Sequence, residues 1–428
     1  MLIKNKTKNA LVASGGGLKA LFFHIGVGMR LENQGLIFNG GLLKTPRTEL
    51  LPPNEVGTNS IDMLVGSSGG CLFTMGPAFG YSARDMYNLF MDDRALKKAG
   101  LARGIHKYVN FNTQAVTELI KGVTRAIKNG LNIEAISVMS PLYLGKLQER
   151  LHNFLLTEDY TRVGADLFTV TTPLNQTGRI VYCRLPHQSS FSRLHEYFDS
   201  DEYGLLGSQS LLGSQREQRI VYRNDADLSA TIAASCSLQI FQPYCVTHKN
   251  GDKIDLVDGE TRKTLSYKIA SDNGADLVFI SYTHVPYRFD NTVGSIKKFG
   301  MTRVAIQSIY LMIEEKILAS RELNRAKNMA YDVVDEGFDE LIAELPEHRS
   351  ILEQHRRRIL KKLVVGLGIK RSVDYIFIKP DQNDSDFYFE WHLGMGKAYI
   401  ERIVQKGYEA ADKALKGINI EFNDRKAT

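Results

Sequence analysis

Residues 61–75, IDMLVGSSGGCLFTM, join an apolar run to a glycine-rich turn and decide the fold of this chain. The run 61–65 is typical of a short buried strand, and the small or apolar residues 71–75 begin a helix. Between them, Gly66-Ser67-Ser68-Gly69-Gly70 fits the pattern G-x-S-x-G, in which larger neighbours of the serine would clash at a tight strand-to-helix turn. The stretch therefore predicts an α/β unit with the Ser68 hydroxyl at a helix N-terminus.

A similar unit opens the chain. The buried strand expected at 10–13 runs into Gly15-Gly16-Gly17 and then into an apolar segment, 21–31, with helical spacing. Further strand-like runs, separated by helix-like stretches, are found at residues 167–171, 180–183 and 277–281. Strands that alternate with helices predict an α/β fold with a mainly parallel sheet covered by helices.

Two regions fall outside this alternation. Residues 185–220 are polar and contain the local repeat LLGSQ at 205–209 and 211–215, which indicates a surface insertion, either a flap over a site or a plain loop. The pattern is helical and charged over residues 291–428. We therefore expect a main domain at 1–290 that carries the site, and a mainly helical C-terminal region that packs on it or caps it.

The composition limits the class of protein. With 428 residues, 43% of them hydrophobic and 24% charged, the chain can bury a large core, and its net charge of +6 suits an anionic surface. The basic residues come without interleaved aromatic residues, which argues against a nucleic-acid partner. The four cysteines form no Cys-x-x-Cys or Cys/His pair, so neither zinc nor disulfides are predicted, and a reducing compartment, the cytoplasm, is expected.

Any membrane contact is expected to be peripheral, because the apolar run after the N-terminal lysines is too short for a signal peptide and no window approaches the roughly 18 apolar residues of a membrane span. Residues 94–128 hold eight lysines and arginines against one acidic residue, Glu118. An apolar stripe in this region follows helical spacing and comprises Val116, Leu119, Ile120, Val123 and Ile127. Such a helix either lies on an anionic bilayer or faces the core with a solvated basic back.

Acyl transfer by a serine needs donors for the developing oxyanion as well as a nucleophile. Gly15-Gly16-Gly17 offers unhindered backbone N–H groups, and both glycine turns are expected at the carboxyl edge of one sheet, where α/β sites form. The chain lacks the spacing of a P-loop and the full dinucleotide-binding fingerprint. Lys19, a cation in the first turn of a helix, opposes the helix dipole, so it either binds an anion or is solvated.

Three segments together resemble the patatin-like phospholipases, namely Ser14–Lys19, His24–Val27 and Gly66–Gly70. In that family a glycine-rich loop forms the oxyanion hole, the serine of G-x-S-x-G is the nucleophile, and an aspartate followed by glycine completes a dyad without histidine. The resemblance spans about residues 8–285 and implies a three-layer αβα sandwich. It implies the following site residues: Ser68 as nucleophile, Asp258 as base, and Gly15, Gly16 and Gly17 as oxyanion hole.

The segment around the predicted base supports the resemblance with two departures, the first of which is Gln239 at a position where the family usually has proline. Residues 234–243 are similar to the family segment that leads into the aspartate, and Asp258-Gly259 follows them. Glu260 then stands where the family has glycine or alanine. If the Glu260 carboxylate lies beside Asp258, it would raise the pKa of that base; alternatively, the Glu260 side chain points to solvent.

The resemblance implies a lipid acyl hydrolase of the phospholipase A or lysophospholipase type. It would cleave fatty-acyl esters of phospholipids through a Ser68 acyl-enzyme, in contact with an anionic membrane surface and with no metal or cofactor. Two alternatives stay open. His284 follows Ser68 and Asp258 in the chain order of an α/β-hydrolase triad. The second alternative is a catalytically silent lipid-binding or scaffold protein of the same fold, and the presence of Glu260 favours it.

Overall fold

The computed structural model describes residues 2–128, 140–186, 188–189, 220–238 and 240–422. The chain forms two compact units, one made of Met1–Gly294 with Tyr375–Thr428 and the other of Ser295–Asp374. The first segment ends at Gly294, close to the boundary expected at residue 290, but the last segment, which was expected in the C-terminal region 291–428, belongs to the first unit. Most of the predicted polar insertion at 185–220 lies outside the described residues.

Four parallel strands form the centre of the first unit. They are β13 (Leu277–Ser281), β2 (Asn9–Ala13), β4 (Ser60–Gly66) and β7 (Asp166–Pro173), in that spatial order. Every residue of these strands is buried, as expected for a parallel sheet that is covered on both faces. The predicted mixed α/β fold with a mostly parallel sheet is thus confirmed.

Shorter strands extend this sheet. β8 (Arg179–Tyr182) and β12 (Lys253–Val257) pair antiparallel with β7, and β10 (Ile220–Arg223) runs parallel to β8. The remaining strands of the sheet are β3 (Ile37–Phe38), β9 (Gln188–Ser189), β11 (Tyr244–Thr247) and β14 (Asp374–Ile378). Two small ribbons join β1 (Leu2–Ile3) to β15 (Asn419–Ile420) and β5 (Asn110–Phe111) to β6 (Leu142–Tyr143).

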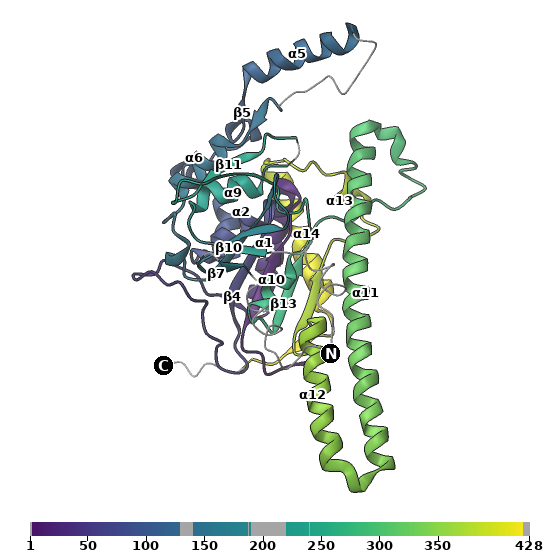
Figure 1. The fold of residues 1–428 in the computed structure, drawn as a ribbon. Coiled ribbons are helices and arrows are strands. Elements are labelled where there is room, and N and C mark those ends of the chain that lie inside the picture. Colours follow the sequence, from purple (N-terminus) through teal and green to yellow (C-terminus); the bar gives the residue numbers. More distant parts are fainter. Residues whose placement is uncertain (1, 129–139, 187, 190–219, 239, 423–428) are drawn as a thin grey trace. The chain divides into compact units, whose positions relative to one another are not determined.

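The described residues of the first unit also form α-helices (Figure 1). They are α1 (Gly17–Asn33), α2 (Gly69–Ala78), α3 (Ala83–Met91), α4 (Asp93–Lys98), α5 (Thr113–Lys128), α6 (Gly145–Phe154), α9 (Leu228–Ser235), α10 (Tyr267–Asp272), α13 (Ser385–Phe389) and α14 (Lys397–Leu415). The helix α14 packs so closely on α1 that a Cβ on Gly26 would lie 2.8 Å from the backbone nitrogen of Tyr408. This contact explains why the end of the chain belongs to the first unit.

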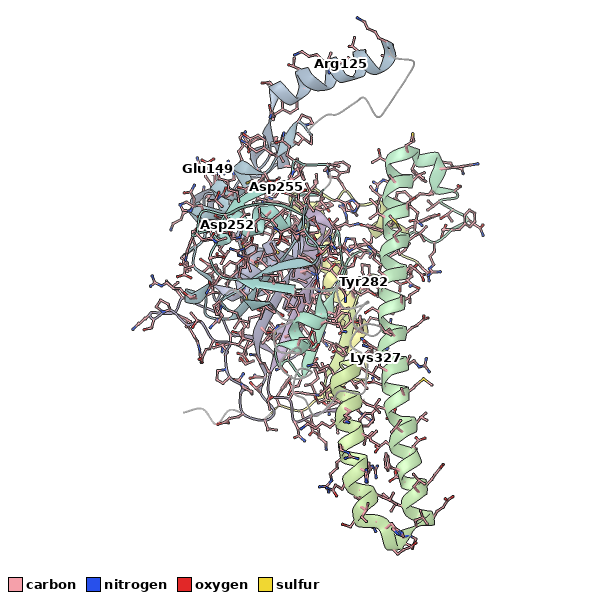
Figure 2. All side chains as sticks on the ribbon, viewed as in Figure 1. Arg125, Glu149, Asp252, Asp255, Tyr282 and Lys327 are labelled. Atoms are coloured by element: carbon pink, nitrogen blue, oxygen red, sulfur yellow. The ribbon has the colours of Figure 1, made fainter. Side chains whose placement is uncertain are left out.

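The second unit is a helical hairpin, which confirms the predicted helical region near the C-terminus. It consists of α11 (Gly300–Glu344) and α12 (Arg349–Leu367), with short 3-10 helices at Ile296–Phe299 and Pro346–His348. The Lys327 ammonium donates a hydrogen bond of 2.6 Å to the Leu367 carbonyl (Figure 2). Arg356 pairs with Asp335 at 2.6 Å, so polar contacts tie the two helices together.

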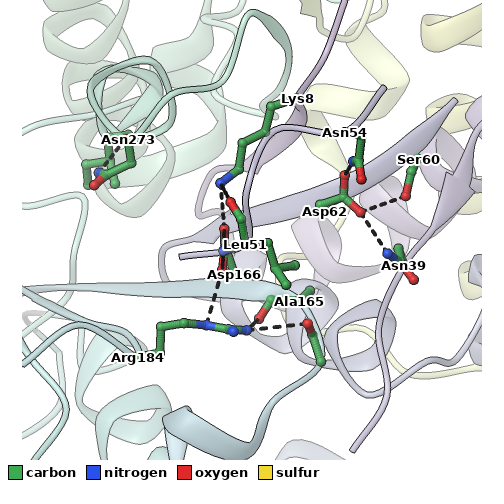
Figure 3. A network of polar contacts seen from close by, with 12 residues as sticks. Lys8, Asn39, Leu51, Asn54, Ser60, Asp62, Ala165, Asp166, Arg184 and Asn273 are labelled. Atoms are coloured by element: carbon green, nitrogen blue, oxygen red, sulfur yellow. Dashed lines mark hydrogen bonds and ion pairs between the residues drawn. The ribbon is translucent and has the colours of Figure 1, made fainter. Parts of the chain in front are cut away.

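A buried polar network holds the amino-terminal end of the parallel strands (Figure 3). Asp166, the first residue of β7, pairs with Lys8 at 2.8 Å and with Arg184 at 3.2 Å, and all three side chains are buried. The Leu51 N–H donates to both oxygens of Asp166.

None of the helices in the described residues combines the length and apolar character needed to cross a bilayer.

Candidate active site

The two predicted glycine turns lie side by side, because β2 and β4 are neighbouring parallel strands whose carboxyl ends meet at one edge of the sheet. The Ser67 N–H donates to the Ala13 carbonyl at 3.1 Å, which joins the turns directly. A Cβ on Gly70 would lie 2.5 Å from the carbonyl carbon of Ala13, so only glycine fits at this approach. The predicted strand-turn-helix geometry around Ser68 is therefore present.

Ser68 occupies the strained turn before α2. Its backbone has φ 52° and ψ −128°, a conformation that non-glycine residues rarely adopt, and its surface is 2% exposed. The Ser68 N–H donates to Ser235 Oγ at 2.9 Å, and the Ser235 hydroxyl donates to the Val170 carbonyl at 2.6 Å. Ser235 therefore anchors the turn, a role that its local sequence does not predict, although the residue lies in the segment 234–243 that leads to Asp258.

Asp258 reaches the same edge through β12. Val257 pairs with Thr172 of β7, while Gly66 pairs with Thr169 of the same strand, so the residues that follow β12 and β4 are brought together. Asp258 is 2% exposed, and its N–H donates to the Ser237 carbonyl at 2.8 Å. This places the predicted base beside the predicted nucleophile.

The contact between the two side chains is close but not fully aligned. A hydrogen bond from the Ser68 side chain lowers the pKa of Asp258. Asp258 Oδ2, however, has no well-formed hydrogen bond to any described residue, whereas Oδ1 accepts the Glu260 N–H at 2.8 Å. Catalytic hydrogen bonds are often loose without substrate and tighten in the reacting complex, so we interpret the pair as being within reach of each other.

The glycine loop faces this pair. A Cβ on Gly15 would lie 3.4 Å from Ser68 Oγ, so the Gly15 backbone is next to the hydroxyl. Gly16 and Gly17 have positive φ angles of 130° and 68°, and among the described residues nothing accepts a hydrogen bond from their N–H groups. The Gly15 N–H, in contrast, donates to Glu260 Oε1 at 3.1 Å. Two of the three predicted oxyanion donors are thus open.

Burial raises the pKa values of both carboxyl groups at the site. The pKa of Asp258 rises to about 6 by desolvation. The pKa of Glu260 rises to about 7, mainly by desolvation and in addition by the Asp258 charge. Although part of the Glu260 residue is exposed, its Oε2 atom is buried. Asp258 therefore ionises first, and its charge then opposes the ionisation of Glu260.

Two histidines lie behind the glycine loop and are neutral. His24 contacts the Ser14 carbonyl at 2.8 Å and Ser281 Oγ at 2.7 Å, and burial lowers its pKa to about 4. His284 Nδ1 lies 3.3 Å from Ser14 Oγ, and burial together with Lys19 lowers its pKa to about 3. Burial, Ser68 and Glu260 determine the pKa of Asp258, without a contribution from His284 among the described residues. This arrangement favours a direct pair of Ser68 and Asp258.

Lys19 is fully buried, so the expectation of a solvated lysine is wrong. Its ammonium donates to the Phe387 carbonyl at 3.2 Å and lies 4.5 Å from the centre of the Phe387 ring. These contacts help to hold α13 against α1. A role in anion binding stays a prediction.

An apolar cavity of about 640 Å³ opens from the nucleophile. Ser68, Gly17 and Gly69 line one part of it. Most of the other lining residues are apolar and include Leu21, Leu72, Met75, Phe90, Leu147 and Phe154. A cavity of this size and character can enclose a long hydrocarbon chain whose polar end lies at Ser68.

No protein-family model matches this chain, and a search of curated proteins returned no match. The chemical capacity of the site follows from its geometry. It offers a serine on a strained turn, a buried carboxyl beside it, backbone N–H donors from a glycine loop and an apolar cavity. These are the parts that acyl transfer through a serine requires.

Proposed function

We propose that this protein is a lipid acyl hydrolase of the patatin-like kind, built on a three-layer αβα core. The observation that carries the proposal is the position of Ser68, which lies on a strained turn beside Asp258 and lines an apolar cavity. The strained turn exposes one hydroxyl to the cavity, and the cavity accepts the acyl chain of an ester.

In the proposed reaction Asp258 takes the proton of the Ser68 hydroxyl as Oγ attacks the ester carbonyl carbon. The carbonyl oxygen becomes an oxyanion and accepts hydrogen bonds from the glycine-loop N–H groups. The ester bond breaks, and the proton passes from Asp258 to the leaving alcohol. Water, deprotonated by Asp258, then attacks the acyl carbon, the bond from that carbon to Ser68 Oγ breaks, Oγ takes the proton back from Asp258, and the fatty acid is released.

A catalytically silent lipid-binding protein is a second candidate, because the Glu260 carboxyl accepts the hydrogen bond of the Gly15 N–H, one of the predicted oxyanion donors. Such a protein would bind acyl lipids in the cavity without turnover. Hydrolysis that depends on Ser68 separates the two candidates. A triad that includes His284 is less well supported, since the described contacts of its Nδ1 are with Ser14.

The helix α5 supports contact with an anionic membrane surface. Its apolar residues Ile120 and Ile127 are each 62% exposed, so they do not face the core, and Arg125 (Figure 2) and Lys121 are exposed on the same helix. Exposed apolar side chains beside basic residues are typical of helices that lie in the membrane interface. The β5–β6 ribbon, from which α5 extends, is flanked by Tyr108 and Leu144, and both line the cavity.

Phospholipid vesicles test the function together with the membrane contact. We expect the wild type to release fatty acid from vesicles that contain an anionic lipid, as measured by mass spectrometry of the lipids. The variant Ile120→Ser/Ile127→Ser should bind these vesicles about tenfold more weakly or worse, because two exposed apolar side chains are lost. It should still hydrolyse a soluble short-chain ester.

The matched control is Val56→Ser/Leu174→Ser, which replaces two residues of similar exposure, 49% and 51%, outside α5. We expect it to bind vesicles as the wild type does, and wild-type binding should weaken as salt is added. Equal binding of the wild type to neutral and anionic vesicles would contradict the electrostatic part of the proposal.

The pH dependence of kcat/KM reports the ionisation of the base. Because Asp258 must be ionised to accept the proton and its pKa is raised to about 6, the rate should fall as the pH drops through about 6. We expect the same rising limb in the wild type and in Glu260→Gln, since Asp258 ionises before Glu260 does. A midpoint near the ordinary aspartate value of about 4 would contradict this assignment of the base.

A further inference from the structure

Glu260 brings a second carboxyl group to the nucleophile. Its Oε1 accepts hydrogen bonds from the Gly15 N–H at 3.1 Å and from the Ser67 hydroxyl. A Cβ on Gly15 would lie 2.9 Å from both Glu260 Cγ and Ser68 Cβ, so the two side chains meet over the Gly15 backbone. The Glu260 carboxyl therefore stands at the point where a substrate carbonyl has to approach Ser68.

The bound carboxylate oxygen is chemically similar to the oxyanion of the proposed reaction. Both carry negative charge, and both accept a hydrogen bond from a backbone N–H of the glycine loop. The Gly15 N–H cannot stabilise both at once, and two negative charges at this short distance repel each other. Glu260 in its present position therefore competes with the transition state.

A contribution to the stability of the fold does not explain why the Glu260 carboxyl contacts the Gly15 N–H. Glu260 forms no ion pair among the described residues, although its charge partly offsets the lowering of the Arg179 pKa by burial. Burial raises the pKa of Glu260 to about 7 and outweighs its hydrogen bonds with the backbone of Gly15 and Leu265, which act to lower that pKa, so the charged carboxylate is disfavoured in this position. Departures of this kind from good packing are typical of functional sites.

The contact can be released by the side chain alone. The Glu260 N–H donates to Asp258 Oδ1 at 2.8 Å, so the Glu260 backbone helps to hold the base. Rotation about the side-chain bonds would free the Gly15 N–H and leave this backbone contact intact. The base and the oxyanion donors can thus be controlled separately.

We propose that Glu260 is an internal plug of the oxyanion hole. In the resting protein its carboxylate holds the Gly15 N–H, and it withdraws when a substrate acyl group enters the site. The proposal rests on the hydrolase function proposed above and adds that the Glu260 side chain inhibits it. Wild-type turnover is then limited by the displacement of Glu260 as well as by the chemical step.

The test measures one kinetic constant and one inhibition constant in Glu260→Ala and Glu260→Gln. The first is kcat/KM for a soluble short-chain p-nitrophenyl ester. The second is the inhibition constant of an alkylboronic acid, whose boron bonds to Ser68 Oγ and becomes a tetrahedral anion while the hydroxyl proton passes to Asp258. Because the loss of one oxyanion donor costs about 10²- to 10³-fold in rate, we expect kcat/KM of Glu260→Ala to rise at least about tenfold and its inhibition constant to fall at least about tenfold.

Glu260→Gln should gain less, because its amide oxygen still accepts the Gly15 N–H although the charge is gone. It keeps the side-chain volume, which guards against a folding defect in the alanine variant. Asp255→Asn is the matched control, since Asp255 is an exposed carboxylate of β12 (Figure 2) and its replacement removes the same charge without touching the glycine loop. We expect wild-type rates from this variant.

Two outcomes would overturn the proposal and are distinguishable. Unchanged or slower hydrolysis in both Glu260 variants, with turnover that still depends on Ser68, would overturn the plug and leave the hydrolase function intact. Absence of Ser68-dependent turnover from the wild type and from every Glu260 variant would overturn the hydrolase function and the plug with it.

Discussion

Ser68→Ala is expected to lower kcat for ester hydrolysis by about 10⁴-fold or more, because the variant has no nucleophile to form the acyl-enzyme. Asp258→Asn is expected to lower kcat by about 10²- to 10⁴-fold, since an amide cannot accept the serine proton. KM should change little in both variants, because the cavity that holds the acyl chain is untouched. Steady-state kinetics with a soluble ester measures these values.

Asp255→Asn again provides the control for Asp258→Asn, because it removes a carboxylate from β12, the strand that leads to Asp258, without reaching Ser68. Thermal unfolding of each variant should be close to that of the wild type, so that a lost rate is not a lost fold. Turnover of Asp258→Asn within threefold of the wild type would contradict the role of Asp258 as base. A collapse of turnover in His284→Ala at unchanged stability would instead support the triad.

Asp166→Asn is expected to lower the free energy of unfolding of the first unit by about 3–5 kcal/mol, the usual cost of removing one partner from a buried ion pair. Asp166 faces the buried cations Lys8 and Arg184 (Figure 3), and the amide would leave both without a compensating charge. Urea denaturation measures the change.

The site should be spared in this variant. Asp166 begins β7 at the amino-terminal end of the parallel strands, whereas Ser68 follows the carboxyl end of β4. We therefore expect near-normal kcat/KM at low temperature, where the variant is still folded. A loss below about 1 kcal/mol would show that the network adds little to stability, as exposed ion pairs do.

The centre of the fold could be predicted from local patterns. The apolar run before Gly66 has the length of a buried strand, and the glycines on both sides of Ser68 are needed because the neighbouring backbone comes close. The glycine triplet Gly15-Gly16-Gly17, which follows the strand predicted at 10–13, likewise predicted the other glycine turn of the site. Parallel strands place such turns at one edge, so the meeting of Gly15 with Ser68 followed from the fold class.

Other features depend on contacts between distant parts of the chain, which periodicity does not encode. Asp258 could be assigned only through the family resemblance, since the pairing of β12 with β7 brings it to Ser68. The contact of Glu260 with the Gly15 N–H was not foreseen, and neither was the burial of Lys19 against Phe387. Such side chains are placed by tertiary packing, so their local sequence leaves them ambiguous.

The identity of the nucleophile is the central claim, and a fluorophosphonate tests it most directly. Such a reagent bonds through phosphorus to an activated serine oxygen and expels fluoride, while the serine proton passes to the base. Peptide mass spectrometry of the treated protein should find the adduct on Ser68 in the wild type and little of it in Asp258→Asn. An unmodified Ser68 in folded wild-type protein, or an adduct on another serine, would contradict the account.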